Sequence, residues 1–453
     1  MNIEDSVEWE RYGELNARSK HHANKVRSII PSRTSRSLLR HPPFPFFVER
    51  ASGVSSTDID GNERIDFHNN YTTLIHGHGH PEIMKAIEQQ LPKGTSYSAP
   101  VVLEERLASL LCERVKSVEQ VVFNNSGTEA VMLALRIARA VNGRKLIGKF
   151  EGGYHGASDF VMVGGHDLPS LDDPARVTKP TAGVAGLPPG ATEEVVLMRY
   201  NDAQAVREAV ASYGKDLAAI IVEPIQGAGG VIPADDEFLK VLREETAKAG
   251  IVLIFDEVIS LRHAVGGAQG YYGLEPDLTT MAKTIGGGFP IGAVGGKREF
   301  MRVLEDPSEG GTVANLGTFS ANPMSVTAGA VSMELLDEAA IAHINALGDS
   351  ARSGLAGILT KHDLPAQVCG AGSLLQVHWT NAPLLDARGP ATADANLNLL
   401  TFLGLCNRGV QLSMRGIVAL STPMRQSHID TLLTAFEETV VSLKSQGYCQ
   451  GYC

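Results

Sequence analysis

The chain has 453 residues, of which 43% are hydrophobic and 20% charged, and its formal net charge at pH 7 is −11. This composition is that of a folded globular protein with room for two or three domains, and it excludes a largely disordered chain. The acidic balance argues against broad nucleic-acid binding, because no excess of cations is available to neutralise phosphates.

The chain ends and the cysteines indicate the compartment. The first 20 residues are charged and do not resemble a secretory signal, and no run of 18 apolar residues occurs. Five scattered cysteines, an odd number, indicate free thiols in a reducing environment. We therefore expect a soluble, cytoplasmic protein. Cys449 and Cys453 in the tail "GYCQGYC" could bind a metal, but a pair of thiols lacks the usual four ligands and a frayed terminus is expected.

Short elements are expected before residue 82. Residues 6–28 predict a surface helix, and the alternation around Asp60-Gly61-Asn62 predicts a hairpin. The stretch "HGHGHPE" places His76, His78 and His80 at alternate positions. We favour a tight loop over a metal site here, because the glycines suggest a tight loop and no cysteine or carboxylate pairing confirms metal binding.

From about residue 82 helices and apolar strands alternate. A strand is predicted over 120–125, followed by a helix over 128–141 that ends at Asn142-Gly143. An apolar strand over 217–224, an amphipathic helix over 234–250 and a strand over 251–258 predict a βαβ unit in a parallel sheet. Ligands of such sheets bind beyond the carboxyl ends of the strands, so we expect Asp256 to point into a site.

Two further stretches complete the outline. Residues 164–195 are rich in Gly and Pro and too long for a tight connection, which indicates a surface excursion or a loop near the mouth of the site. From about residue 330 helical patterns dominate, with short strands around 374–379 and 417–422. This pattern predicts a C-terminal α+β portion.

Three features around the βαβ unit point to one chemistry. Ser126, Gly127 and Thr128 stand between a strand and a helix, where they could bind a phosphate or simply cap the helix. Asp256 could be a site carboxylate, an ion-pair partner or a helix cap, whereas a metal ligand is not supported because no HExxH motif or close ligand cluster accompanies it. Lys283, followed by three glycines, could be a sheltered amine or a surface lysine. Together they are what pyridoxal 5′-phosphate requires: a phosphate anchor, a carboxylate that keeps the pyridine nitrogen protonated, and an amine for a Schiff base. We expect the glycines to let the backbone pass close to the cofactor.

Six motifs in a fixed order carry a family resemblance. They are "NNSGTEA", "GGYHGASD", "IIVEPIQGAGG", "LIFDEVISLR", "PDLTTMAKTIGGGFPIGAVGG" and "GTFSANP". In these motifs the chain resembles a class-III aminotransferase of fold type I from about residue 30 to residue 425. The resemblance implies an α/β fold with a large cofactor-binding domain (82–330) whose mostly parallel, seven-stranded sheet is flanked by helices. It also implies a small α+β domain from both chain ends (1–81 and 331–453).

The resemblance implies a role for each residue that matches a motif. Lys283 matches the catalytic Schiff-base lysine, and Asp256 matches the residue paired with the pyridine nitrogen. Thr318 matches a threonine that reaches the phosphate of the neighbouring subunit's cofactor, which implies a homodimer with active sites at the interface. The remaining cofactor contacts implied are Gly127 and Thr128 with Ser126 at the phosphate, Tyr154 stacked on the ring, Val258 on its other face, and Gln226 near the ring hydroxyl.

The substrate is less defined by these patterns. Arg36 in "TSRSLLRHPPFPFF" and Arg415 in "SMRGIVALS" resemble two arginines that bind the substrate carboxylate in β-phenylalanine-type aminotransferases, although each could be an ordinary ion pair. Such enzymes move an amino group from an amino acid, for example a β- or aromatic one, to a 2-oxo acid. "GGYHGASD" and the loop through "GVAGLPPGATEE" instead resemble glutamate-1-semialdehyde 2,1-aminomutases. A catalytically silent cofactor-binding protein is the third possibility.

Overall fold

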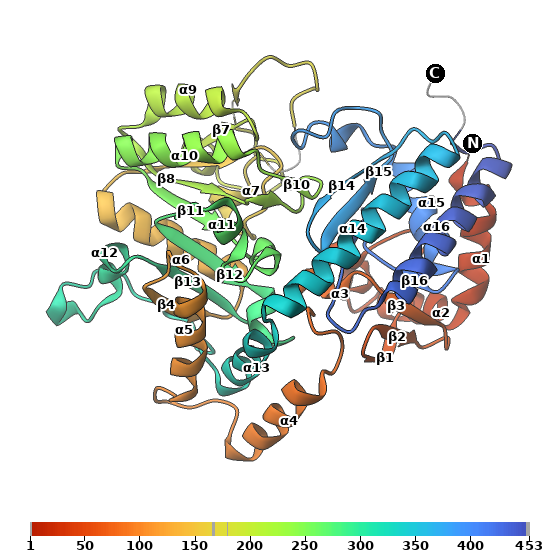
Figure 1. The fold of residues 1–453 in the computed structure, drawn as a ribbon, viewed down its shortest axis with the longest axis horizontal. Coiled ribbons are helices and arrows are strands. Elements are labelled where there is room, and N and C mark those ends of the chain that lie inside the picture. The colour runs from red at the N-terminus through yellow and green to blue at the C-terminus, as the bar shows by residue number, and fades with distance from the viewer. Residues whose placement is uncertain (1, 165–167, 179, 450–453) are drawn as a thin grey trace.

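The computed structural model (Figure 1) describes residues 2–164, 168–178 and 180–449. The described strands form four sheets: the large sheet, a four-stranded sheet β1-β2-β3-β16, a three-stranded sheet β14-β15-β17 and the pair β9-β10. The large sheet has eight strands in the order β4-β13-β12-β11-β8-β5-β7-β6. Strands β12, β11, β8, β5 and β7 are parallel neighbours, whereas β13 and β6 run antiparallel to theirs. The strands are β4 Gln120–Asn124, β5 Leu146–Phe150, β6 Val177–Thr178, β7 Val195–Met198, β8 Leu217–Val222, β11 Val252–Asp256, β12 Leu278–Ala282 and β13 Gly292–Gly296.

Helices cover both faces of this sheet, and its central strands β8, β11 and β12 are therefore buried at every position. Ile220 and Val222 of β8 share a core with α9 (Ala203–Tyr213) and α10 (Asp236–Ala249). Ala219 and Ile221, which point the other way, share a core with α6 (Gly127–Asn142). This alternation follows from the two-residue period of a strand.

The α/β fold and the predicted β8-α10-β11 unit are confirmed. Gly250 ends α10 with φ +63, a left-handed conformation that favours glycine. In the parallel pairing of β11 with β12, Asp256 lies opposite Thr280, so the carboxyl ends of the two strands are neighbours. The predicted count of seven strands is one too low: β6 has only two residues, too few to show a strand period in the sequence.

A second core combines both ends of the chain. It contains Tyr12, Ala23 and Phe67 together with buried side chains from the range 336–440. Figure 1 shows the N-terminal (red) and C-terminal (blue) elements side by side. The division at residues 82 and 331 stays a prediction. The elements here are α1 Val7–Leu15, α2 Ala17–Val26, β1 Val48–Ser52, β2 Ser55–Asp58, β3 Glu63–Asp66, α14 Glu338–Lys361, β14 Gln367–Ala371, β15 Leu374–His378, α15 Ala395–Cys406, β16 Val410–Gln411, β17 Ile417–Ala419 and α16 Gln426–Ser445.

The N-terminal prediction needs a correction. A single surface helix over 6–28 is wrong, because α1 and α2 are separated at Asn16 (φ −122), whose side-chain amide donates to Tyr12 O at 2.8 Å. Tyr12 is fully buried, so these helices also contribute to the core. The hairpin around Asp60-Gly61-Asn62 is confirmed, since β2 and β3 pair antiparallel across it.

The remaining elements are helices outside these two cores, short helices, and the two-stranded sheet of β9 and β10. Helix α13 (Pro323–Leu335) packs against α4 (Pro81–Gln90) and α5 (Leu103–Arg114). Within the described ranges, none of the helices has the length and apolar character needed to cross a membrane. The shorter elements are α3 Asn69–Thr72, α7 Asp159–Met162, α8 Pro189–Glu193, β9 Ile225–Gln226, β10 Ile232–Pro233, α11 Gly267–Tyr272 and α12 Arg298–Met301.

Candidate active site

Asp256 ends β11 and is held by two donors. Its Oδ2 lies 2.8 Å from Nδ1 of His155, and its Oδ1 accepts from the backbone N–H of Val258 at 3.1 Å. Both side chains are almost completely buried. A carboxylate has about four lone-pair positions, so Asp256 retains acceptor capacity for a further proton donor. Burial, the largest influence, lowers the pKa of His155, so the ring is neutral at pH 7 and can donate its Nδ1–H.

Lys283 follows β12 directly, one strand away from Asp256. Its φ of +52 is a left-handed conformation that side-chain-bearing residues rarely adopt, and such strain is often found at functional sites. Burial lowers the pKa of its amine to about 8, opposed by the charges of Asp256 and Glu223 and assisted by those of Arg262 and Arg36. A substantial neutral fraction of this amine therefore exists near neutral pH.

The glycines after Lys283 have a packing role that the sequence did not predict. A Cβ on Gly286 would lie 2.6 Å from the side chain of Ile291, and one on Gly287 would lie 2.5 Å from Ala328 O in α13. Gly287 also has φ +57. These glycines therefore let the 3-10 turn Lys283–Gly286 lie close against its neighbours.

The N-terminus of α6 approaches the same region. A Cβ on Gly127 would lie 3.2 Å from Val258 Cγ2 and 3.4 Å from Ala282 Cβ, so the helix begins beside the ends of β11 and β12. Ser126 caps the helix by accepting from Glu129 N at 3.2 Å, and Thr128 Oγ1 accepts from Ala157 N at 3.3 Å. The cap alternative for Ser126 is thus observed, while the first N–H groups of α6 still provide a positive end for an anion.

Tyr154 and Gln226 are joined to this region through main-chain contacts. The side-chain amide of Gln226 donates to Glu151 O at 2.7 Å, and Tyr154 N donates to Glu223 Oε2 at 2.9 Å. The Tyr154 side chain is 52% exposed, which leaves its ring accessible for stacking. Burial and the nearby Asp256 raise the pKa of Glu223 to about 8, because a second negative charge beside Asp256 is unfavourable.

Pyridoxal 5′-phosphate fits these groups. The buried Oε1 of Gln226 has no hydrogen-bond partner among the described residues, so it can accept from a hydroxyl. Asp256 can accept from a protonated ring nitrogen, and the start of α6 suits a phosphate. The individual cofactor contacts stay predictions, but the structure brings Gly127, Thr128, Val258, Asp256 and Lys283 to neighbouring strand and helix ends.

The residues predicted to bind the substrate, Arg36 and Arg415, and the residue predicted to reach the partner's cofactor, Thr318, lie outside the strand and helix ends described above. Arg36 Nη1 donates to Asn70 Oδ1 at 2.6 Å, and its guanidinium lies 5.3 Å from the centroid of the Tyr71 ring. Arg415 is exposed, and its charge and that of Arg36 both act to lower the pKa of Tyr71, which burial raises. Thr318 lies in an exposed loop, beside Phe319.

Sequence reasoning missed three polar residues of the site. His155 and Glu223 stand inside the motifs "GGYHGASD" and "IIVEPIQGAGG", so polarity beside a buried strand end was an available signal. Arg388 had no such signal. Its guanidinium forms two bonds to the Glu151 carboxylate, at 2.7 and 2.9 Å, directly before the segment that carries Tyr154 and His155.

Among the described residues, the histidines and cysteines considered as metal ligands are not gathered into a group that could hold a metal ion. His76 contacts Thr422 Oγ1 and Ser332 O, and His78 Nε2 lies 2.8 Å from Asp66 Oδ2. The described cysteines, which are Cys112, Cys369, Cys406 and Cys449, are free thiols, whereas Cys453 lies outside the described residues. The cytoplasmic location expected from the thiols stays a prediction.

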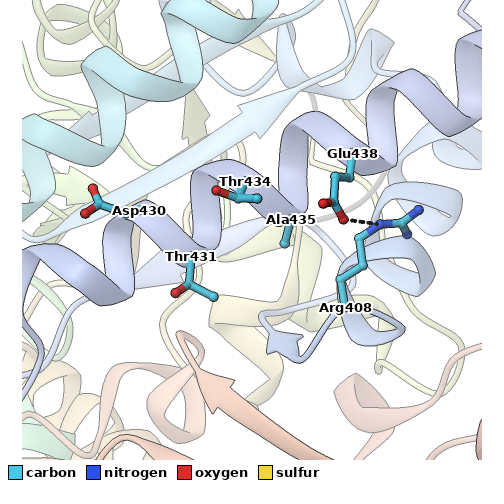
Figure 2. Close-up of a pocket in the computed structure, with 6 residues that line it drawn as sticks. All are labelled: Arg408, Asp430, Thr431, Thr434, Ala435 and Glu438. Atoms are coloured by element: carbon cyan, nitrogen blue, oxygen red, sulfur yellow. Dashed lines mark ion pairs between the residues drawn. The ribbon is translucent and has the colours of Figure 1, made fainter.

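A surface pocket on α16 is separate from this site (Figure 2). Its Arg408 forms an ion pair with Glu438 at 3.4 Å and a second with Glu8 at 2.9 Å, so this cation is already neutralised. None of the predicted site residues lines it. The lining residues are Arg408, Asp430, Thr431, Thr434, Ala435 and Glu438.

Known proteins are similar to this chain in sequence and fold over nearly its whole length. The sequence model of the family described as aminotransferase class-III matches residues 38–439. Glutamate-1-semialdehyde 2,1-aminomutase of Methanothermobacter thermautotrophicus is 38% identical over 426 residues, covering 93% of this chain and 98% of the relative. Two solved structures are also similar. An omega-transaminase from Sphaerobacter thermophilus has a TM-score of 0.88 and 37% identity, covering 98% of this chain and 100% of its own. A β-phenylalanine aminotransferase from Variovorax paradoxus has a TM-score of 0.88 and 33% identity, covering 97% of each chain.

These findings confirm the predicted family, fold type, enzyme class and cofactor. The match covers all four sheets of the described residues and every motif on which the resemblance depends. The chain belongs to the class-III aminotransferases, enzymes of fold type I that depend on pyridoxal 5′-phosphate.

Proposed function

We propose that this protein is an aminotransferase that moves an amino group from an amino acid, for example a β- or aromatic one, to a 2-oxo acid in two ping-pong half-reactions. The observation that supports the proposal is that Lys283, Asp256 and the start of α6 lie together at the carboxyl ends of β11 and β12 in the large sheet. A panel of α-, β- and ω-amino donors with pyruvate or 2-oxoglutarate tests it. A silent cofactor-binding protein would turn over none of them.

Each residue has a defined task in this proposal. When bound, pyridoxal 5′-phosphate supplies the electron sink that makes breaking a Cα–H bond feasible. Asp256, fixed by His155, holds the proton on the ring nitrogen. Lys283 Nζ would take the proton from Cα of the amino donor in the first half-reaction and supply a proton to Cα of the new amino acid in the second, a task suited to an amine with a pKa of about 8.

Arg36 and Arg415 are proposed to bind the substrate carboxylate. Support comes from their shared proximity to Tyr71 and from the suitability of a guanidinium fork for a carboxylate. Replacing both with alanine should raise KM for the amino-acid donor strongly while cofactor binding is retained. An unchanged KM would remove both residues from the substrate site.

Intramolecular amino transfer on glutamate-1-semialdehyde is the second candidate. Its support is the 38% identity to an enzyme named as that aminomutase. Supplying glutamate-1-semialdehyde alone and measuring 5-aminolevulinate separates the two, because isomerisation needs no 2-oxo acid and transamination does.

We also propose a homodimer in which Thr318 completes the partner's site. Thr318 stands between Leu316, 86% exposed, and Phe319, 60% exposed. Large apolar side chains this exposed and this close together suit a protein interface. A second copy of this chain would bury them and bring Thr318 to the partner's cofactor phosphate.

A further inference from the structure

Helix α3 is a left-handed turn built from residues that are not glycine. The φ angles of Asn69, Asn70, Tyr71 and Thr72 are +47, +50, +54 and +70. For an L-residue this conformation costs about 1–2 kcal/mol relative to the right-handed one. A run of four such residues persists only where the surroundings hold it, and such strain concentrates at binding sites.

Buried groups hold the start of the turn. Asp66 Oδ1 accepts from the backbone N–H of His68 and of Asn69, each at 2.9 Å. The side-chain amide of Asn69 donates to Ala419 O at 2.8 Å in β17. The start of the turn is therefore attached to both β3 and β17 through Asp66 and Ala419.

The turn presents its side chains to Arg36, the proposed carboxylate ligand. Asn70 accepts from Arg36 at 2.6 Å, and the Tyr71 ring lies under the same guanidinium. The Tyr71 hydroxyl donates to Leu38 O at 2.7 Å, which fixes the ring. Arg36 is thereby attached to the turn rather than free in solvent.

His68 contacts the Tyr71 ring of this group. Its ring centroid is 3.8 Å from that of Tyr71, edge-on at 75°, and the residue is only 5% exposed. Its buried Nε2 has no hydrogen-bond partner among the described residues, an arrangement that is costly unless a ligand provides the partner. Burial lowers the pKa of His68 to about 4, with the charges of Arg36 and Lys283 acting in the same direction and that of Asp66 opposing it, so the imidazole is neutral at pH 7.

The geometry points to His68 as a specificity-determining residue whose Nε2–H donates a hydrogen bond to the carboxylate of the amino-acid substrate, beside Arg36. A carboxylate only accepts hydrogen bonds, so the ring proton must be on Nε2. This inference rests on the proposed aminotransferase function and adds a neutral donor to the two proposed arginines.

The test compares H68L with H68Q, using the panel donor of highest kcat/KM and 2-oxoglutarate. H68L removes the donor and should raise KM for the amino acid about 10- to 100-fold, as expected for a lost hydrogen bond to a charged group. H68Q keeps an N–H donor at similar reach and should restore most of the affinity. The absorbance of the bound cofactor should be the same in the wild-type protein, H68L and H68Q.

H78Q is the matched control, since His78 also contacts Asp66 but lies outside the turn. Its KM should stay within about twofold of the wild-type value, as is usual away from a binding contact. The inference is overturned if H68L leaves KM unchanged, if it releases the cofactor instead, or if H78Q raises KM equally. If the wild-type protein transfers no amino group at all, the proposed function fails instead.

Discussion

The amine of Lys283 carries the most direct residue-scale prediction. Its pKa is lowered from 10.5 to about 8, so the amine is protonated below about pH 8 and neutral above it. In the cofactor-free protein, acylation of Lys283, followed by mass spectrometry of its peptide, should reach half its maximal rate near pH 8. A half-maximum near pH 10.5, as for an exposed lysine, would contradict the sheltered environment.

His155 is predicted to act through Asp256. H155F removes the donor to Asp256 Oδ2 and leaves this carboxylate less well fixed. A hydrogen bond to a charged group contributes about 1.5–3 kcal/mol, so kcat should fall by about 10- to 100-fold with little change in donor KM. Steady-state kinetics with saturating cofactor measure this. H155Q, which can still donate, should recover part of the rate, and equal kcat values in wild type and H155F would show that Asp256 needs no such support.

At the scale of elements, Arg388 joins the loop after β15 to the end of β5. Besides Glu151, its guanidinium donates to Asp173 O at 2.6 Å and Ala175 O at 2.9 Å, within the Gly/Pro-rich excursion. Removing one member of a buried pair leaves an uncompensated charge, so R388M should lower the free energy of unfolding by about 3–5 kcal/mol. Urea unfolding measures this change.

A double variant and a control variant show whether the loss of stability in R388M comes from the unpaired buried charge. R388M/E151M removes both charges and should recover much of the loss. The exposed pair Arg106–Glu334 is the control, because R106M should change the free energy of unfolding by less than about 1 kcal/mol. Equal effects of R388M and R106M would mean that the buried pair does not join these elements.

The elements differ in how far the sequence predicts them. The β8-α10-β11 unit was predictable because its strands are apolar runs and Gly250 marks the helix end. The break at Asn16 was not predictable, since Tyr12 is buried in a core whose other side chains come mainly from residues 336–440, far away in the sequence. Position in a motif was enough to propose Lys283 and Asp256. Arg388 could not be found, because its partner Glu151 is 237 residues away in the chain.

At the scale of the whole molecule, the loop around Thr318 predicts a dimer. F319D places a charge in the proposed interface and should shift the protein from dimer to monomer in sedimentation velocity, with loss of activity. T318A should leave the dimer intact and weaken cofactor retention, because only a phosphate contact is lost. A wild-type monomer with full activity would contradict an active site shared between subunits.

The chain as a whole is proposed to move nitrogen between two separate molecules. The most direct measurement follows the nitrogen itself: the protein is incubated with a panel of ¹⁵N-labelled amino acids and unlabelled 2-oxoglutarate or pyruvate, and the products are analysed by mass spectrometry. The account predicts ¹⁵N in the amino acid formed from the 2-oxo acid, and none with K283A. Conversion of glutamate-1-semialdehyde to 5-aminolevulinate without a 2-oxo acid, together with no ¹⁵N transfer from any donor, would contradict it.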